Sequence, residues 1–241
     1  GSSGQRLCRR KPARFARRGA MMRKGLASPA ATAEPIRWPA LVSRCRELTL
    51  DLQFEEKSMF QLIASVVLSA GLVYVSRASL RAPRSHGFYR FWAWEFIVAL
   101  VLLNINVWFH APFSWYQTIS WFLLIVCIVP LACGIHSLIS QGKPVVHREA
   151  EPQLLAFEKT STLVTTGIYH YIRHPLYSSL LLLTWGVFFK APAWPGVLLA
   201  LAATLFLVAT ARTDEAECIR FFGPSYQAYM KQTKMFLPFV F

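Results

Sequence analysis

The sequence predicts an all-α membrane protein: a multi-pass transmembrane helical bundle of about five membrane segments that includes a C-terminal helical hairpin. Hydrophobic residues make up 54% of the 241 residues and charged residues only 16%, a balance typical of membrane proteins rather than soluble domains. Apolar runs long enough to cross a bilayer recur along the chain, and we find no alternating pattern typical of strands. The expected organisation is one membrane domain, residues 58–241, after two N-terminal segments.

Residues 1–35 form a basic tail that we exclude from the fold. The first 33 residues contain no acid, and their Arg and Lys residues are spread among Ala, Ser and Gly. This composition is typical of an organellar targeting segment, and also of a disordered tail that touches anionic lipid or of an appended tag. Although the net charge is +14, the basic residues are not spread over an aromatic-basic face. We therefore expect no nucleic-acid partner.

Residues 36–57 have the spacing of an amphipathic helix. Charged residues separate the apolar positions at helical intervals, which favours a helix lying on the membrane surface. The apolar positions are Leu41, Val42, Cys45, Leu48 and Leu52, and the charged ones are Arg44, Arg46, Glu47, Asp51 and Glu55.

Three apolar runs follow, at residues 60–76, 91–111 and 115–139. Each is long enough to be interpreted as a membrane span. The second run contains Glu95, Asn104 and Asn106. Because such side chains are costly in lipid, we expect them to face other helices or a wet cavity.

Two further apolar runs, 176–190 and 194–211, are separated by a three-residue link that contains Pro192. So short a link predicts a tight antiparallel hairpin, whose first arm is short for a full span.

The distribution of Lys and Arg predicts the orientation in the membrane. When residues 1–33 are left out of the count, the positive-inside rule places the face that contains the C-terminus toward the cytosol, or toward the matrix or stroma of an organelle. We expect an integral multi-pass protein of a mitochondrial, plastid or endoplasmic-reticulum membrane.

The cysteine and histidine pattern predicts no metal site. Five cysteines occur without a CxxC pair, so neither a disulfide framework nor a zinc site is indicated. His170 and His174 form a lone HxxxH, which is too little for a di-iron site. The scattered histidines, which we interpret as structural or interfacial, are His86, His110, His136 and His147.

The stretch GIYHYIRHPLYSS, residues 167–179, concentrates polar and aromatic side chains just before a leucine run. His174 precedes Pro175, which disfavours helical torsions at the histidine and suits the first turn of a helix. Arg173 and His174 are therefore expected at the mouth of that helix, where free amides and the helix dipole favour an anion.

A second polar cluster, residues 211–241, falls on the same face of the membrane. Arg212 and Glu215 are three residues apart on a helix, as are Asp214 and Glu217, so each pair is expected to interact locally. Gly223 and Pro224 end that helix and begin another, with Tyr226 and Tyr229 on one side. Two clusters of mixed charge at one rim suit a zwitterionic ligand.

The segments STLVTTGIYHYIRHPLY and RTDEAECIRFFGPSYQAYMKQTKMFLPF resemble the C-terminal half of the isoprenylcysteine carboxyl methyltransferase family, within a superfamily of membrane methyltransferases that includes phospholipid methyltransferases. The resemblance covers residues 161–241. It implies that S-adenosylmethionine binds at the membrane face and that a lipid-modified substrate enters between helices. The cofactor-binding residues carried over by position are Tyr169, Arg173, His174, Pro175, Tyr177, Asp214 and Glu215.

If the nucleophile is a carboxylate, Arg173 or Arg212 would orient it through paired hydrogen bonds, so these are the expected catalytic residues. The chain departs from the family at Ser179, often glycine, and at Asp214, usually glutamate. The polar insert at residues 147–160 is longer than the usual link of the family and is expected to reshape the lid over the cofactor.

The resulting hypothesis is S-adenosylmethionine-dependent methyl transfer to a lipid-linked acceptor, with a prenylcysteine carboxylate as the expected acceptor. Such an acceptor fits poorly with an organelle interior. Three alternatives stay open: a phospholipid N-methyltransferase, an NADPH-dependent sterol reductase, and a non-catalytic accessory subunit that joins other membrane subunits in an organellar complex. Fold alone does not separate an enzyme from an accessory subunit.

Overall fold

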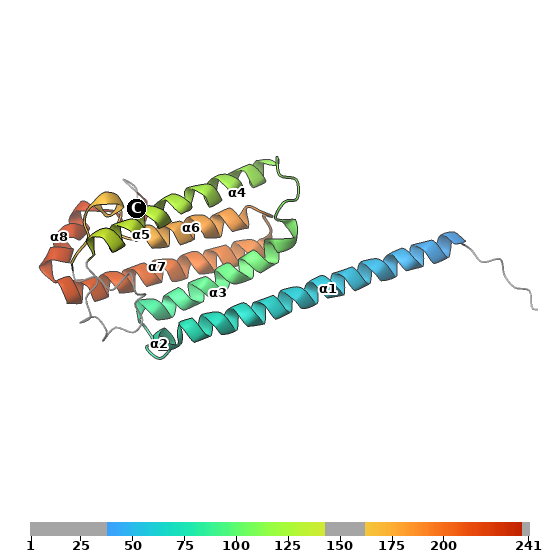
Figure 1. Ribbon diagram of the computed structural model, residues 1–241, viewed down its shortest axis with the longest axis horizontal. Coiled ribbons are helices and arrows are strands. Elements are labelled where there is room, and N and C mark those ends of the chain that lie inside the picture. Colours follow the sequence, from blue (N-terminus) through green and yellow to red (C-terminus); the bar gives the residue numbers. More distant parts are fainter. Residues whose placement is uncertain (1–37, 143–161, 238–241) are drawn as a thin grey trace, which may run out of the picture. The chain divides into compact units, whose positions relative to one another are not determined.

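The structure, a computed structural model, describes residues 38–142 and 162–237. The chain divides into a unit that ends at Leu48 and a second unit, Thr49–Phe241. All regular elements of the described residues are helical (Figure 1), which confirms the predicted class. In chain order they are α1 (Trp38–Val75), α2 (Arg77–Leu80), α3 (His86–Asn104), η1 (Ile105–Val107), α4 (Trp115–Val126), α5 (Ile128–Gln141), η3 (Gly167–His170), α6 (Pro175–Phe188), α7 (Trp194–Phe222) and α8 (Pro224–Gln232).

Within residues 38–142 and 162–237, four helical stretches are long and apolar enough to cross a membrane: Val42–Val75, His86–Val107, Trp115–Gln141 and Trp194–Phe222. The fifth apolar helix, Pro175–Phe188, is shorter, as the sequence predicts for the first arm of the hairpin. The set agrees with the expected count of about five membrane segments.

Helix α1 is continuous, so most of the predicted surface helix and the first predicted span lie in one element. The later part of α1 contacts α3 through polar side chains. Ser69 Oγ donates to Glu95 Oε2 at 2.7 Å, and Gln61 Nε2 donates to the Leu102 carbonyl at 3.1 Å. Glu95 therefore faces another helix, as expected for an acid in a span. The predicted tail, residues 1–35, lies outside the described residues.

The third span is two helices, because α4 ends at Val126 and α5 begins at Ile128. Pro130 explains the break. A proline has no amide proton to give and its ring clashes with the carbonyl four residues earlier, which here belongs to Val126. The Cys127 amide still donates to Leu123 at 2.9 Å, so the backbone is interrupted for only one residue.

The predicted hairpin is formed by α6 and α7, which pack against α3 and α4 (Figure 1). Small residues with no exposed surface, Ala200 and Ala203, lie on the buried side of α7, and Ser120 Oγ of α4 donates to the Gly186 carbonyl at 2.7 Å. Because lipid provides no hydrophobic drive between helices, close packing of small residues and such hydrogen bonds hold the bundle together.

Replacing Gly186 by alanine is expected to destabilise the bundle by about 1 to 3 kcal/mol, the range for overpacking a core. A Cβ at Gly186 would lie 3.0 Å from Leu124 Cγ, so the Leu124 side chain of α4 would have to shift within a packed interface. Gly71 on α1 is the matched control, since a Cβ there meets nothing within 4 Å. Thermal unfolding in detergent should show a loss for Gly186→Ala and none for Gly71→Ala, and equal midpoints would contradict this packing.

One end of the bundle contains a buried cation in the link between α6 and α7. Lys190 is 1% exposed. Its Nζ lies 3.4 Å from the centroid of the Trp121 ring and 5.1 Å from that of Trp108, and donates to Gln117 Oε1 at 3.1 Å. Gln117 Nε2 donates back to the Lys190 carbonyl at 3.0 Å.

Candidate functional site

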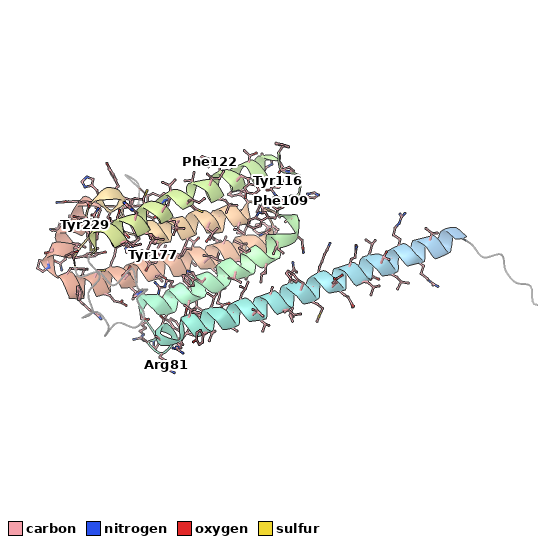
Figure 2. All side chains as sticks on the ribbon, in the orientation of Figure 1. Arg81, Phe109, Tyr116, Phe122, Tyr177 and Tyr229 are labelled. Carbon is pink, nitrogen blue, oxygen red and sulfur yellow. The ribbon has the colours of Figure 1, made fainter. Side chains whose placement is uncertain are left out.

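The predicted polar clusters meet at the other end of the bundle. Figure 2 shows Tyr177 and Tyr229 toward this end, and Phe109 and Tyr116 at the opposite one. Tyr229 Oη donates to the Tyr169 carbonyl at 2.6 Å, so α8 is tied to the short helix η3. The side chains of all three tyrosines, 169, 177 and 229, are buried.

The local backbone explains how the RHP tripeptide is presented. Gly167 starts η3 with φ +65°, and a Cβ there would lie 2.8 Å from Ser137 Oγ of α5, so this turn needs glycine. His174 has φ −124° and ψ 63°, outside the helical region, and α6 begins at Pro175. The predicted helix start is confirmed, and Arg173 and His174 lie at its mouth.

Arg173 joins three parts of the chain. Its Nε donates to Glu215 Oε1 of α7 at 2.7 Å. Its Nη1 donates to the carbonyl of Met230 at 3.1 Å and to that of Thr233. The side chains of Arg173 and Glu215 are 10% and 9% exposed. A buried guanidinium with this many charge-assisted bonds has a single orientation.

His174 and Tyr177 face the same turn of α7. His174 Nε2 lies 3.3 Å from Glu215 Oε1 and Nδ1 lies 3.6 Å from Asp214 Oδ2. Tyr177 Oη donates to Asp214 Oδ2 at 3.3 Å, and its ring stacks on the imidazole with centroids 5.3 Å apart. Asp214 and Glu215 therefore bind different sides of one aromatic and cationic cluster.

The segment after α8 closes the site by backbone hydrogen bonds. The Arg173 amide donates to Lys234 at 2.8 Å and the His174 amide donates to Met235 at 3.1 Å. Ser178 Oγ donates to the Phe236 carbonyl at 2.8 Å, and the Phe236 side chain is 3% exposed. The amides at the mouth of α6 are thus used by the chain itself.

The structure brings together every predicted cofactor residue: Tyr169, Arg173, His174, Pro175, Tyr177, Asp214 and Glu215. Arg212 does not join them, because it is exposed and makes no ion pair or hydrogen bond with the described residues. The expected local pair between Arg212 and Glu215 is wrong: Glu215 faces the bundle interior, where Arg173 is available, and Arg212 faces outward. The insert at residues 147–160 lies outside the described residues.

Sequence reasoning missed a pair beside this site. His86, interpreted as structural or interfacial, is 1% exposed and its Nδ1 lies 2.5 Å from Glu217 Oε2. Glu217 was expected to interact with Asp214 on its own helix. The signal available in the sequence was a histidine directly after Ser85, the cap residue of α3, but its partner is 131 residues away.

Two tyrosines of α8 are buried against the acidic turn of α7. Burial raises the pKa of the Tyr226 phenol above its ordinary value, and the nearby Cys218, Asp214 and Glu215 raise it further. Burial likewise raises the pKa of Tyr229. A group whose pKa is raised by folding stabilises the fold below its unfolded pKa, and this contribution is lost as the pH rises above that value.

Tyr226→Phe is therefore expected to leave stability at pH 8 nearly unchanged and to reduce the loss of stability above pH 10.0, the ordinary pKa of tyrosine. The slope of unfolding free energy against pH should become shallower by about 1.4 kcal/mol per pH unit, the value for one proton. Denaturant unfolding in detergent between pH 9 and 11.5 measures it. An unchanged slope would show that Tyr226 ionises as easily in the fold as outside it.

Comparison with known proteins finds a matching family and a related protein. Residues 152–224 match the phospholipid methyltransferase family. The chain resembles membrane methyltransferases. A Schizosaccharomyces pombe protein, protein-S-isoprenylcysteine O-methyltransferase, is 34% identical over 105 residues, which are 43% of this chain and 43% of that protein. The chain thus aligns with less than half of the length of this relative, and no solved structure matches.

The residues of the site fit the donor that a membrane methyltransferase uses. S-adenosylmethionine has a carboxylate, an ammonium and a sulfonium. Arg173 Nη2 makes no hydrogen bond to a described residue, so it can bind the carboxylate. Asp214, whose side chain is 22% exposed, can accept from the ammonium. No group of three metal-ligating side chains occurs among the described residues, and none is needed for this fit.

Proposed function

We propose that this integral membrane protein transfers the methyl group of S-adenosylmethionine to a lipid-linked acceptor at the membrane face. One observation carries the proposal: Arg173, His174 and Tyr177 converge on Asp214 and Glu215, which lie 37 to 42 residues further along the chain. This cluster of mixed charge fits a zwitterionic cofactor. The match of residues 152–224 to phospholipid methyltransferases supports it independently.

The bound cofactor would supply an activated methyl on a positively charged sulfur. Methyl transfer is an in-line displacement that depends mainly on alignment and on exclusion of water. Arg173 and Asp214 would bind the two charged ends of the cofactor, and Tyr177 would help to hold Asp214 in place through its hydroxyl. Phe236 and the segment after α8 would exclude water, because they cover His174 and Arg173.

The acceptor is proposed to be a prenylcysteine carboxylate. The name of the Schizosaccharomyces pombe relative supports this choice, and Arg212, exposed on α7 at the same end, would orient a carboxylate through paired hydrogen bonds. A phospholipid amine is the second candidate, favoured by the family matched at residues 152–224. The proposed partners are membrane lipid and, for the first candidate, a lipid-modified substrate.

Calorimetry of the detergent-solubilised protein with S-adenosylmethionine tests the cofactor. We expect micromolar binding that Asp214→Asn weakens about 10- to 100-fold, the effect of losing a hydrogen bond to a charged group. Asp51→Asn, at an exposed position of α1, should bind like the parent protein.

Methylation of a farnesylated cysteine then tests the acceptor, with ethanolamine phospholipid as the second substrate. Cofactor binding without transfer to either acceptor would reject both acceptor classes. No binding by folded protein would reject the enzyme and favour an accessory subunit that keeps the architecture of a methyltransferase.

A further inference from the structure

A cavity of about 530 Å³ lies between α1, α3 and α7. A volume of this size is typical of sites that bind small molecules. Three of the side chains that line it, Leu62, Leu103 and Leu198, are 60%, 47% and 67% exposed. Because all three lie in stretches long and apolar enough to span a membrane, the cavity opens toward lipid, and a ligand would enter it from the bilayer.

The cavity is separate from the candidate cofactor site. Leu199, which lines the cavity, and Asp214 are 15 residues apart on α7, which corresponds to about 22 Å along a helix. Pro195, another lining residue, follows Lys190 by five residues, at the end of the bundle away from the RHP cluster. A group bound in the cavity is therefore out of reach of a methyl donor held by Arg173 and Asp214.

Two polar side chains of α1 line the cavity with hydrogen-bonding capacity to spare. Gln61 Nε2 donates to the Leu102 carbonyl at 3.1 Å. Because a carbonyl only accepts, this contact uses the amide NH2 and leaves Gln61 Oε1, which accepts from no described residue. Ser65 Oγ also makes no hydrogen bond with a described residue. The cavity wall thus offers one acceptor and one hydroxyl, four residues apart on α1.

The chemistry of this wall selects a hydroxyl group. A hydroxyl can donate to Gln61 Oε1 and accept from Ser65 Oγ at the same time, whereas an ester carbonyl can only accept and would leave Gln61 Oε1 without a donor. No charged side chain lines the cavity, so a phosphate or an ammonium would be desolvated there without a counter-charge, which is costly. The other lining residues are Leu, Ala and Pro, which suit an apolar body.

The shape of the cavity favours fused rings over an extended chain. Its lining comes from about one turn of each helix: residues 61–65 of α1, 99–103 of α3 and 195–199 of α7. Such a stretch rises by about 6 Å, so the cavity is short along the bundle and owes its volume to its width. An extended acyl or prenyl chain would instead need a groove several turns long.

We propose that this cavity binds a membrane sterol, whose single hydroxyl group bonds Gln61 and Ser65 and whose rings pack against α3 and α7. The proposal does not depend on the proposed methyl transfer. Gln61 and Ser69 of α1 already bond α3 through polar groups. A sterol adds apolar contacts among α1, α3 and α7, and so holds α1 against the bundle.

Photolabelling tests the site. The full chain in phosphatidylcholine nanodiscs is labelled with a cholesterol analogue that has a diazirine in its ring system, and the labelled peptides are identified by mass spectrometry. We expect label on the peptides that contain residues 61–65 and 99–103, removed by excess cholesterol. Cholesteryl methyl ether has the same rings but cannot donate a hydrogen bond, so it should compete about 3- to 10-fold less well, the effect of losing one hydrogen bond.

Substitutions separate the polar contact from the space. Ser65→Ala should weaken competition by cholesterol about 3- to 10-fold, and Ala99→Phe, which fills the cavity, should abolish the label. Ser58→Ala and Ala70→Phe, at exposed positions of α1 outside the cavity, are the matched controls and should label like the parent protein. Cholesterol should raise the midpoint of thermal unfolding of the parent protein, as a ligand of the folded state does, but not that of Ala99→Phe.

The remaining outcomes overturn the proposal. Label spread over all lipid-facing helices and not displaced by cholesterol would show contact with bulk lipid only. Competition by cholesteryl methyl ether equal to that by cholesterol would contradict the recognition of a hydroxyl, and equal competition by farnesol, an open-chain alcohol, would contradict the choice of a sterol. If Ala99→Phe fails to fold, Ser65→Ala and the competing lipids still decide. Binding of S-adenosylmethionine by Ala99→Phe measures the proposed function separately.

Discussion

Arg173→Ala is expected to abolish S-adenosylmethionine binding and to lower the free energy of unfolding by about 3 to 5 kcal/mol, the cost of breaking a buried ion pair by removing one partner. The substitution leaves Glu215 buried without its guanidinium and the carbonyls of Met230 and Thr233 without a donor. Arg173→Lys should recover only part of the loss, because an ammonium cannot reproduce the planar fork.

Calorimetry and thermal unfolding in detergent measure both effects. Lys231→Ala, an exposed cation on α8, is the control and should change neither. If Arg173→Ala bound the cofactor and unfolded like the parent protein, the contacts of Arg173 with Glu215, Met230 and Thr233 would contribute little to binding or to stability. Lost binding with full stability would instead assign Arg173 to the cofactor alone.

Lys190→Ala is expected to destabilise the protein by about 3 kcal/mol, from the loss of a desolvated cation–π contact and of one partner of a buried hydrogen bond. The Nζ of Lys190 lies over Trp121 and near Trp108, and Gln117 Oε1 would lose its donor. Because Lys190 lies at the end of the bundle away from the RHP cluster, cofactor binding by the folded fraction should be unchanged.

Lys190→Met separates charge from packing in the same measurement. Burial lowers the pKa of Lys190, which shows that desolvation opposes its charge, so methionine should cost less than alanine. Equal losses for both variants would mean that the cation supplies the stability. Lys190→Ala could instead lower the free energy of unfolding by less than about 0.5 kcal/mol, the level of ordinary surface substitutions. That result would show that the contacts of Lys190 with Trp121, Trp108 and Gln117 do not stabilise the fold.

Local patterns were enough to predict much of the site. The order His174, Pro175 predicted where α6 begins, since proline restricts the residue before it and suits the first turn of a helix. Gly223 and Pro224 predicted the boundary between α7 and α8 for the same local reason. The convergence of these segments followed from counting membrane crossings.

Partner choice could not be predicted in this way. Spacing on one helix suggested that Arg212 pairs with Glu215, but Glu215 binds Arg173, 42 residues earlier in the chain. Glu217 binds His86 across 131 residues. Local spacing predicts only which side chains can reach one another on the same helix. A buried carboxylate instead pairs with a cation that is buried beside it in the folded protein, since an unpaired buried charge is costly.

The sequence by itself determined the helical class, the apolar segments, the helix boundaries at prolines and glycines, and the set of residues at the rim. These depend on torsional limits and on the transfer of apolar side chains, which act within a few residues. Only the tertiary structure decided that Arg173 binds Glu215, that Lys190 lies against Trp121 and Trp108, and that His86 binds Glu217. Those outcomes depend on which side chains meet when helices distant in sequence pack together.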